Sequence, residues 1–273
     1  MEKLLLFIPQ WQDSGVTDEL YHGSFALKNY SEELGKCKFN AIEVDNKKRL
    51  IKENNIWGYS IIYEQLTRVR ETINDNKPLK IFSLGGGCGI EVPIVSYLYS
   101  LYPDLTLFWF DAHGDLNTPE SSPSKYFHGM PLRFLTEKIE NKIGDCVNTI
   151  PSRQVHLIGL RDLDEPEKLF IESENIDVAR LGKNFINTFK NILGNNKNKE
   201  AYIHIDLDVI DPEYYKNVKC PAKKGLKISE LIKAIELINK EMKITGFSIV
   251  ENTETDKAEI RKLKKIIRLG LNI

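Results

Sequence analysis

The residues of this sequence that are best suited to chemistry lie in a short segment in which aspartates and a histidine alternate. Asp111, His113 and Asp115 come directly after the apolar run 105–110. If the backbone stays extended there, alternate side chains point to the same side. Carboxylates and an imidazole form a ligand set suited to manganese, iron or zinc. The segment therefore predicts a metal site, and the alternative is an acidic loop exposed to solvent.

A second segment repeats this pattern later in the chain. Asp206 and Asp208 follow the apolar run 201–205. Two ionised aspartates this close repel each other unless a cation lies between them. Because a pair of aspartates follows each of two strands, we expect the two pairs to form one shared site for two metal ions. Such ions, about 3.5–4 Å apart, can hold and ionise a water molecule between them.

The elements that position these residues alternate between strands and helices. Several of the strands are continuous runs of β-branched and aromatic residues, which is typical of a parallel sheet covered on both faces. The alternation predicts a three-layer α/β domain, in which ligands bind beyond the carboxyl ends of the strands. We expect strands at 4–9, 41–44, 80–84, 105–111, 155–160, 175–178, 201–206 and 245–250. We expect helices at 57–75, 91–101, 185–193, 229–241 and 255–269.

The overall composition is that of a globular protein without a marked charge. The 273 residues are 41% hydrophobic and carry a formal net charge of −1. No stretch approaches the run of about 20 apolar residues that a membrane helix needs. We therefore expect neither nucleic acid nor a membrane as a partner. No internal repeat is evident, and the tract 194–199 is interpreted as a polar surface turn, so we expect a single domain over residues 1–273.

The N-terminal segment and the cysteines bear on the cellular compartment. Residues 1–12 contain one lysine and a short apolar run, but no cleavage site of small residues follows, so they are interpreted as a first strand and not as a signal peptide. Cys37, Cys88, Cys146 and Cys220 show no paired spacing. Without an export signal they are expected to be reduced, and we expect a cytoplasmic protein.

The two acidic segments lie within longer stretches that resemble the arginase (ureohydrolase) family. These stretches cover 111–120, 122–124, 128–132 and 206–212, and their order and approximate spacing match from about residue 80 to residue 252. The resemblance implies a single α/β domain with a mainly parallel eight-stranded sheet. It also implies manganese-dependent hydrolysis of a guanidinium or related amidine group by a metal-bound hydroxide, as in the conversion of arginine to ornithine and urea.

Carried over position by position, the resemblance implies roles for individual residues. His128 is implied to be a proton shuttle for the leaving amine, and the alternative is a loop histidine hydrogen-bonded beside Gly129. Glu251 is implied to pair with the substrate guanidinium, although the family motif continues Val-Asn-Pro and this chain continues with Asn, Thr and Glu. The alternative for Glu251 is a surface carboxylate at a strand end. The implied metal ligands are Asp111, His113, Asp115, Asp206 and Asp208.

The resemblance also assigns residues to an amino-acid substrate. Asn117, Ser122 and Ser124 stand where the family holds the α-carboxylate, and Asp164 and Glu167 stand where acids meet the α-ammonium group. The alternative for these two acids is the ordinary negative charge at a helix N-terminus, which the helix dipole favours. Because both ends of an amino acid have partners, an arginine-like substrate is favoured over agmatine, which lacks the carboxylate.

Two stretches near the implied substrate depart from the family pattern. Before His128 the family has Gly-Asn and an apolar residue, whereas this chain has Lys, Tyr and Phe at 125–127. These side chains either narrow the pocket, or Lys125 adds a positive contact to a carboxylate. Where the family has Gly-Thr-Pro, this chain has Lys, Cys and Pro at 219–221, followed by Lys223 and Lys224. Such a lysine run is usually a solvated face, but it lies where specificity is normally set.

The glycine-rich segment 85–89 contains Cys88 at the position where the family has its sixth metal ligand, a histidine. Three interpretations stay open. As a thiolate ligand, Cys88 would favour softer ions such as zinc, iron or cobalt over manganese. As a neutral filler, it would leave one metal weakly bound or absent. As a nucleophile, it would have no general base beside it in the sequence. The segment lacks the lysine and the serine or threonine of a phosphate-binding loop.

The sequence supports two hypotheses of function from different classes. In the first, the protein is a hydrolase of linear amidines that uses two divalent ions, either manganese or, with Cys88 as a ligand, zinc, iron or cobalt. In the second, motivated by the changes at Cys88 and at 125–126, it is a catalytically silent family member that binds an amino acid or acts as a structural or regulatory subunit. The resemblance further implies a small guanidino substrate and a homo-oligomer, either a trimer or a hexamer.

Overall fold

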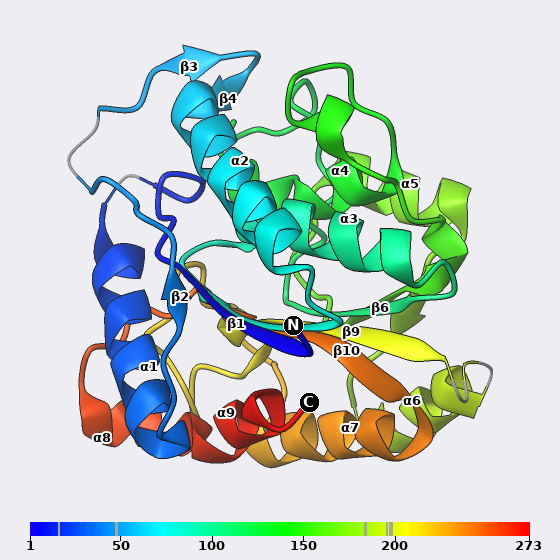
Figure 1. Ribbon diagram of the computed structural model, residues 1–273. Helices are drawn as coiled ribbons and strands as arrows, with labels where there is room; N and C mark the ends of the chain where they lie inside the picture. Colours follow the sequence, from blue (N-terminus) through cyan, green and yellow to red (C-terminus); the bar gives the residue numbers. More distant parts are fainter. Residues whose placement is uncertain (16, 47–48, 183–184, 195, 197–198) are drawn as a thin grey trace.

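The fold is built on a sheet of eight strands (Figure 1). The computed structural model describes residues 1–15, 17–46, 49–182, 185–194, 196 and 199–273. Every pair of neighbouring strands in the sheet is parallel, which confirms the expected mainly parallel eight-stranded sheet. In spatial order the strands are β2 (Asn40–Ala41), β1 (Lys3–Ile8), β5 (Lys80–Gly85), β10 (Lys243–Val250), β9 (Glu200–Asp206), β6 (Thr106–Phe110), β7 (Val155–Ile158) and β8 (Asp177–Ala179).

Helices cover both faces of this sheet, which confirms the three layers expected from the alternation of strands and helices (Figure 1). One face packs against α2 (Tyr59–Asn76), α3 (Glu91–Leu101), α4 (Pro131–Thr136) and α5 (Glu165–Glu174). The other face packs against α1 (Glu19–Gly35), α6 (Phe185–Gly194), α7 (Ile228–Glu241), α8 (Lys257–Ile260) and α9 (Lys264–Leu271).

The central strands are buried on both faces, as their apolar sequences predict. In β6, Leu107 and Trp109 join the core under α2 and α3, whereas Phe108 and Phe110 join the core on the other face. This division arises because successive side chains of a strand point to opposite sides. A strand of this kind is mostly apolar until it ends, so polar side chains gather beyond its carboxyl end.

Several elements differ from those expected from the sequence. The helix expected at 255–269 is divided into α8, a 3-10 turn at Arg261–Leu263, and α9. The buried residues keep a spacing of three to four through the turn, so the apolar pattern of the sequence did not show this division. Of the strand expected at 41–44, only residue 41 lies in a described strand, as the second residue of β2, which pairs with β1. Helices α1 and α5 and the antiparallel pair β3 (Lys52–Glu53) and β4 (Ile56–Trp57) were not expected. Of the expected polar turn 194–199, residues 195, 197 and 198 lie outside the described residues.

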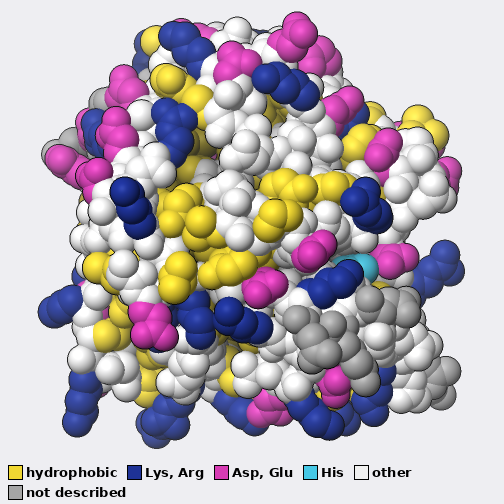
Figure 2. Space-filling model, turned by 45° about the vertical axis from the view of Figure 1, so that its right-hand side comes forward, with side chains coloured by type: hydrophobic (Ala, Val, Ile, Leu, Met, Phe, Trp, Pro, Cys, Tyr) yellow, Lys and Arg dark blue, Asp and Glu magenta, His cyan; other side chains and the backbone are white. Residues whose placement is uncertain are grey.

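The outer sides of the helices carry much of the surface charge. On the face drawn in Figure 2, Lys and Arg side chains gather along the lower edge, at the height of α7 and α9 in Figure 1. In α9, Ile266 and Ile267 are buried whereas Lys265 and Arg268 are exposed, as in an amphipathic helix on a core. In the parts of the chain that the structure describes, no helix combines the length and apolar character needed to cross a membrane.

Candidate active site

The predicted site residues lie beyond the carboxyl ends of four adjacent strands. Cys88 follows β5, Glu251 follows β10, Asp206 ends β9, and Asp111 follows β6. Because these strands are parallel and neighbours in the order β5-β10-β9-β6, their carboxyl ends meet at one edge of the sheet. The sheet therefore brings together residues that are more than 160 positions apart in the sequence.

One group of possible metal ligands consists of Asp111, His113 and Asp208. One ligand atom from each residue lies within 4.8 Å of the others. His113 Nδ1 is 2.9 Å from Asp208 Oδ2 and 3.5 Å from Asp111 Oδ1. Burial alone would lower the pKa of the His113 imidazole, but its hydrogen bonds with Asp111 and Asp208 raise that pKa well above the usual value. A proton on this ring therefore occupies the position that a metal cation would take.

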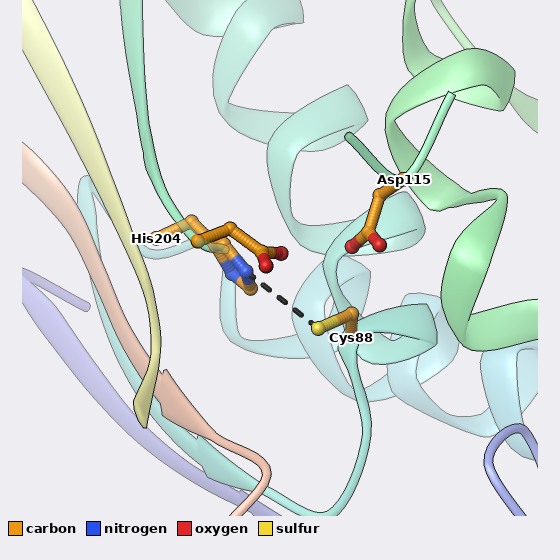
Figure 3. Close-up of side chains that lie close together, drawn as sticks. Cys88, Asp115 and His204 are labelled. Carbon is orange, nitrogen blue, oxygen red and sulfur yellow. Dashed lines mark hydrogen bonds between the residues drawn. The ribbon is translucent and has the colours of Figure 1, made fainter. Parts of the chain in front are cut away.

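A second group contains Cys88, Asp111, Asp115 and His204, again with ligand atoms within 4.8 Å of one another. Figure 3 shows the Cys88 sulfur, the Asp115 carboxylate and the His204 ring pointing toward one another from separate segments. Cys88 also shares a group with Asp206 and Glu251, and its thiol donates to Asp206 Oδ2 at 3.3 Å. Since Asp111 belongs to two of the groups, the arrangement can hold two ions with a carboxylate between them.

The electrostatics of the buried acids fit divalent cations. Burial and the charge of Asp111 raise the pKa of Asp115 well above its usual range. Burial and the charge of Asp208 do the same for the pKa of Asp206. Among the described residues, Asp115 Oδ2 is buried without a hydrogen-bond partner, and Asp115 has a left-handed backbone with φ of 54°. An unpartnered buried oxygen beside other carboxylates needs a proton or a cation, so the residues fit a two-metal site.

Metal binding at this site should strengthen as the pH rises from about 5.5 to 7.5, because the ligands must lose protons first. Burial and the charge of Asp111 raise the pKa of Asp208 to about 6, and Asp115 and Asp206 titrate above their usual range as well. Below these pKa values a proton competes with the metal, and above them it does not.

Calorimetric titration with a divalent ion tests this at several pH values, in two buffers of different ionisation enthalpy. We expect proton release that decreases toward high pH. An affinity that is independent of pH, without proton release, would contradict the assignment.

A cleft of about 170 Å³ opens onto these groups. Its lining brings together most of the residues predicted from the sequence. From the metal groups come His113, Asp115, Asp206 and Asp208, and from the predicted substrate residues come Asn117, Ser122, Ser124, His128, Asp164, Glu167 and Glu251. Cys220, from the divergent stretch 219–221, also lines it.

Glu251 is held in a fixed position at the end of β10. Its backbone is left-handed, with φ of 63°, and its N–H donates to Gly86 O at 2.6 Å. The side-chain atom Oε1 accepts from Ser14 Oγ at 3.0 Å and from the Cys88 N–H at 3.2 Å. Among the described residues, Oε2 is buried without a partner. Burial and the nearby Asp13 carboxylate raise the pKa of Glu251 well above its usual range.

His128 lines the cleft in the 3-10 turn Phe127–Gly129, where its N–H donates to Asp13 O at 3.1 Å. Burial and the positive charge of His113 lower the pKa of His128 to about 4. Its imidazole is therefore neutral near pH 7 and has a nitrogen able to accept a proton.

The residues expected to hold an amino acid line the cleft, but their polar atoms differ in the hydrogen bonds that they already make. Asn117 Nδ2 donates to Asp164 Oδ2 at 2.8 Å, and the hydroxyls of Ser122 and Ser124 are 3.4 Å apart. The two oxygens of Glu167 accept from the N–H groups of residues 116 and 164, at 3.0 and 2.9 Å. Glu167 thus has the contacts of a residue that fixes the start of α5, which favours the helix-terminus alternative for it.

The divergent residues 125–127 are directed away from the cleft. Lys125 Nζ donates to the carbonyls of Pro119 and Glu120, at 2.9 and 2.8 Å. The Tyr126 ring lies 6.5 Å from that of Trp57, and Phe127 is buried in the core. Among the described residues that line the cleft, none comes from this stretch. It therefore neither narrows the cleft nor adds a cation to it.

Two buried residues of the site were not identified from the sequence. His204 points to the same face of the sheet as Trp109, its register partner in β6; its only sequence signal is its position two residues before Asp206. Asp13 is fully buried, and its Oδ2 accepts the Gly89 N–H at 2.9 Å. A side chain at residue 87 would have its Cβ 2.2 Å from that oxygen, so glycine is required there. No local pattern links residue 13 to this loop.

The chain is similar to known proteins over most of its length. A model of the arginase family matches residues 18–262. The arginase of Staphylococcus aureus (strain MRSA252) is 31% identical over 230 residues, which cover 80% of this chain and 74% of that protein. The structure of Entamoeba histolytica arginase in complex with L-ornithine has a TM-score of 0.84 and 22% identity, and covers 99% of this chain and 98% of that one. Formimidoylglutamase from Bacillus subtilis has a TM-score of 0.74 and 17% identity, covering 100% and 87%. At these identities the two structural likenesses concern the fold alone.

Proposed function

This protein belongs to the arginase family, and on that premise we propose that it hydrolyses the guanidino group of an arginine-like amino acid. The homologues are hydrolases that act on guanidino or amidino groups, so the class of reaction is cleavage of such a carbon–nitrogen bond by water. Members differ in the molecule that carries this group, and the choice of an arginine-like substrate rests on the residues of the cleft.

The observation that carries the proposal is the buried, unpartnered oxygen of Glu251. Oε2 is free of hydrogen bonds among the described residues while Oε1 is fixed by Ser14 and by the N–H of Cys88. A guanidinium presents parallel N–H donors that match a carboxylate. A cationic substrate would also relieve the repulsion that Glu251 meets from Asp13 and Asp208. Glu251 is thus suited to orient a guanidinium carbon toward the metal groups.

The remaining roles are assigned to residues of this chain. When bound, the two divalent ions supply Lewis-acid activation of a water molecule. Asp111, His113, Asp115, Asp206 and Asp208 are the residues that would hold them. The neutral His128 ring lines the same cleft, where it can accept a proton and deliver it to the leaving amine.

Of the two acids in the cleft, Asp164 is the better partner for an α-ammonium group. Its Oδ2 accepts from the neutral amide of Asn117 and its side chain takes part in the capping box of α5, whereas both oxygens of Glu167 are bound to backbone N–H groups. Ser122 and Ser124 can donate to the α-carboxylate, together with Asn117 after a modest rearrangement of its amide. The pair of carboxylate and ammonium contacts favours an amino acid over agmatine.

Urea release should be found with arginine or a close amino-acid relative, and should be at least about tenfold lower with agmatine, since loss of the carboxylate contacts costs about 1.4 kcal/mol or more. Protein loaded separately with manganese, zinc, iron and cobalt would be assayed for urea against arginine, agmatine and other guanidino acids, and for formamide with formimino compounds. Asp164→Asn should raise KM for both arginine and agmatine, because agmatine keeps the ammonium group and lacks only the carboxylate.

The outcomes separate the proposal from its alternatives. A preference for agmatine would reject the amino-acid substrate but keep the reaction class. Two bound metals without turnover of any compound would favour the catalytically silent binding protein. The state of Cys88 supports that alternative, because a protonated thiol is a poor metal ligand. Burial and the charges of Asp115 and Asp206 raise the pKa of Cys88 well above its usual value.

The proposal extends to the setting in which the enzyme works. We assign it two divalent ions, with manganese as the first candidate and zinc, iron or cobalt where a sulfur ligand takes part. We also propose that the enzyme is cytoplasmic and that it forms a homo-oligomer, either a trimer or a hexamer. Light scattering on purified protein measures this oligomeric state directly.

A further inference from the structure

His204 is a buried histidine for which the proposed mechanism has no role. It lies on β9, is fully buried, and stacks on Trp109 with ring centroids 3.6 Å apart and an angle of 23° between the rings. Its Nε2 points at the Cys88 sulfur across 3.7 Å, as the dashed line in Figure 3 shows. The ring therefore faces the same space as the second group of possible metal ligands.

The other nitrogen of this ring faces two polar groups. Nδ1 lies 3.3 Å from Glu91 Oε1, which has no hydrogen-bond partner among the described residues, and 3.3 Å from Ser248 Oγ. Glu91 is itself fully buried, and its other oxygen accepts the hydroxyl of Tyr202. Histidines that bind metals in proteins commonly present the second ring nitrogen to a carboxylate, which fixes the tautomer and the ring orientation. The surroundings of His204 therefore leave Nε2 as the nitrogen available to a metal.

We propose that His204 and Cys88 are a pair of ligands to one of the two metal ions, with His204 supplying the imidazole that the family pattern places at position 88. Asp111 and Asp115 complete this ligand set. The inference rests on the proposed function only in taking the site to bind metal.

The geometry of the four residues supports one ion. Their ligand atoms lie within 4.8 Å of one another, whereas the ligands of a tetrahedral zinc ion are about 3.3–3.8 Å apart, so the four side chains would close in on an ion when it binds. A second, independent indication is the Asp115 oxygen Oδ2, which is buried and has no partner among the described residues.

Asp111 is placed to connect this ion with the other one. Its Oδ1 lies 3.5 Å from His113 Nδ1, on the side of the first group. Its Oδ2 accepts the indole N–H of Trp109 at 3.1 Å, on the side of the ring that stacks on His204. The two metal positions therefore differ in chemistry. One has carboxylates and an imidazole, whereas the other has a thiolate and an imidazole in addition to carboxylates. Sulfur and nitrogen donors favour zinc, iron(II) or cobalt(II) over manganese at the second position.

Cobalt(II) provides a probe that does not depend on turnover, because a cobalt–thiolate bond gives a charge-transfer absorption in the near ultraviolet. Metal-free protein would be titrated with cobalt and analysed for bound metal per chain after gel filtration. We expect two ions and the thiolate absorption for the wild type. We expect His204→Gln to retain one ion and to bind the second at least about 100-fold more weakly, since it loses a direct ligand. Cys88→Ser should lose the absorption.

Two further variants control for an effect on folding alone. Glu91→Gln keeps both ligands but removes the carboxylate beside Nδ1, and should weaken the second ion by about 10- to 100-fold. His156→Gln is the matched control, because His156 is also a buried strand histidine stacked on an aromatic ring, that of Phe108 at 5.4 Å. It should bind both ions as the wild type does.

The inference is overturned if His204→Gln or Glu91→Gln binds two cobalt ions with unchanged affinity, or if the wild type shows no thiolate absorption. His204 would then be a core residue satisfied by Glu91 and Ser248. These readouts also separate this inference from the proposed function. Two ions with the thiolate absorption but no hydrolysis of any guanidino compound would reject the function alone. Normal hydrolysis with a His204-independent metal site would reject the inference alone.

Discussion

Replacement of Asp111 by asparagine is expected to remove most of the bound metal and to lower kcat/KM by about 10³-fold or more, as loss of several kcal/mol of metal-assisted stabilisation implies. Asp111 belongs to two groups of possible ligands, one with His113 and one with Cys88. Its oxygens face both sides, one toward His113 and the other toward the indole of Trp109. An amide has one oxygen in place of two and no charge, so it cannot connect two cations.

The measurement combines metal content per chain with steady-state kinetics at saturating metal. Asp211→Asn is a matched control, because Asp211 follows the same strand end as Asp208 but belongs to none of the groups of possible metal ligands among the described residues, and its carboxylate accepts the N–H groups of residues 213 and 225. It should keep both metals. An Asp111→Asn variant with two tightly bound metals and near-normal turnover would show that Asp111 is not a metal ligand and does not connect the two metal positions.

Glu251→Gln should leave the metals in place and lower kcat/KM by roughly 30-fold or more, because breaking a buried ion pair costs about 2–5 kcal/mol. Among the described residues, Oε2 is the carboxylate oxygen of Glu251 without a hydrogen-bond partner, since Oε1 is bound to Ser14 and to the Cys88 N–H. Glutamine has the same shape, so the variant tests the charge.

Because Glu251 also lies within reach of Cys88 and Asp206 as a possible ligand, metal content is measured alongside the kinetics. Glu254→Gln serves as the control, since Glu254 is also buried but binds Asn217 and the N–H groups of residues 255 and 256. It should reduce stability without a specific loss of turnover. Loss of a metal ion from Glu251→Gln would make Glu251 a ligand and remove its proposed role in binding the guanidinium.

Much of the fold follows from local features of the chain. Continuous apolar runs such as 105–110 predict buried parallel strands, and the structure confirms the sheet and its two helical layers. Elements that are too short to show a period, such as β3 and β4, could not be predicted in this way. The amphipathic pattern of 255–269 predicted helix, but it could not show the 3-10 turn at Arg261–Leu263, where the spacing of buried residues stays the same.

The residues of the candidate metal site also fall into those that the sequence could identify and those that it could not. Asp111 and Asp115 could be identified from the sequence because they stand at alternate positions after a strand, and Asp206 and Asp208 for the same reason. Parallel strands bring such ends to one edge of the sheet, so the grouping of these residues followed from the fold class. Cys88 could be placed near them by the resemblance, but the choice between a thiolate ligand and a neutral filler stayed open without knowledge of its neighbours.

The sequence by itself determined the family, the sheet and most of the acidic residues of the candidate metal site, because each depends on short-range spacing and on one rule of parallel sheets. Only the tertiary structure decided what surrounds Cys88. The sequence around His204 indicates only a buried strand, and the sequence around Asp13 indicates only a loop. Both reach the site because β5 and β9 flank β10 and because the 85–89 turn folds against residues 10–13. Strand order and loop contacts of this kind depend on packing across the whole chain, and no local pattern encodes them.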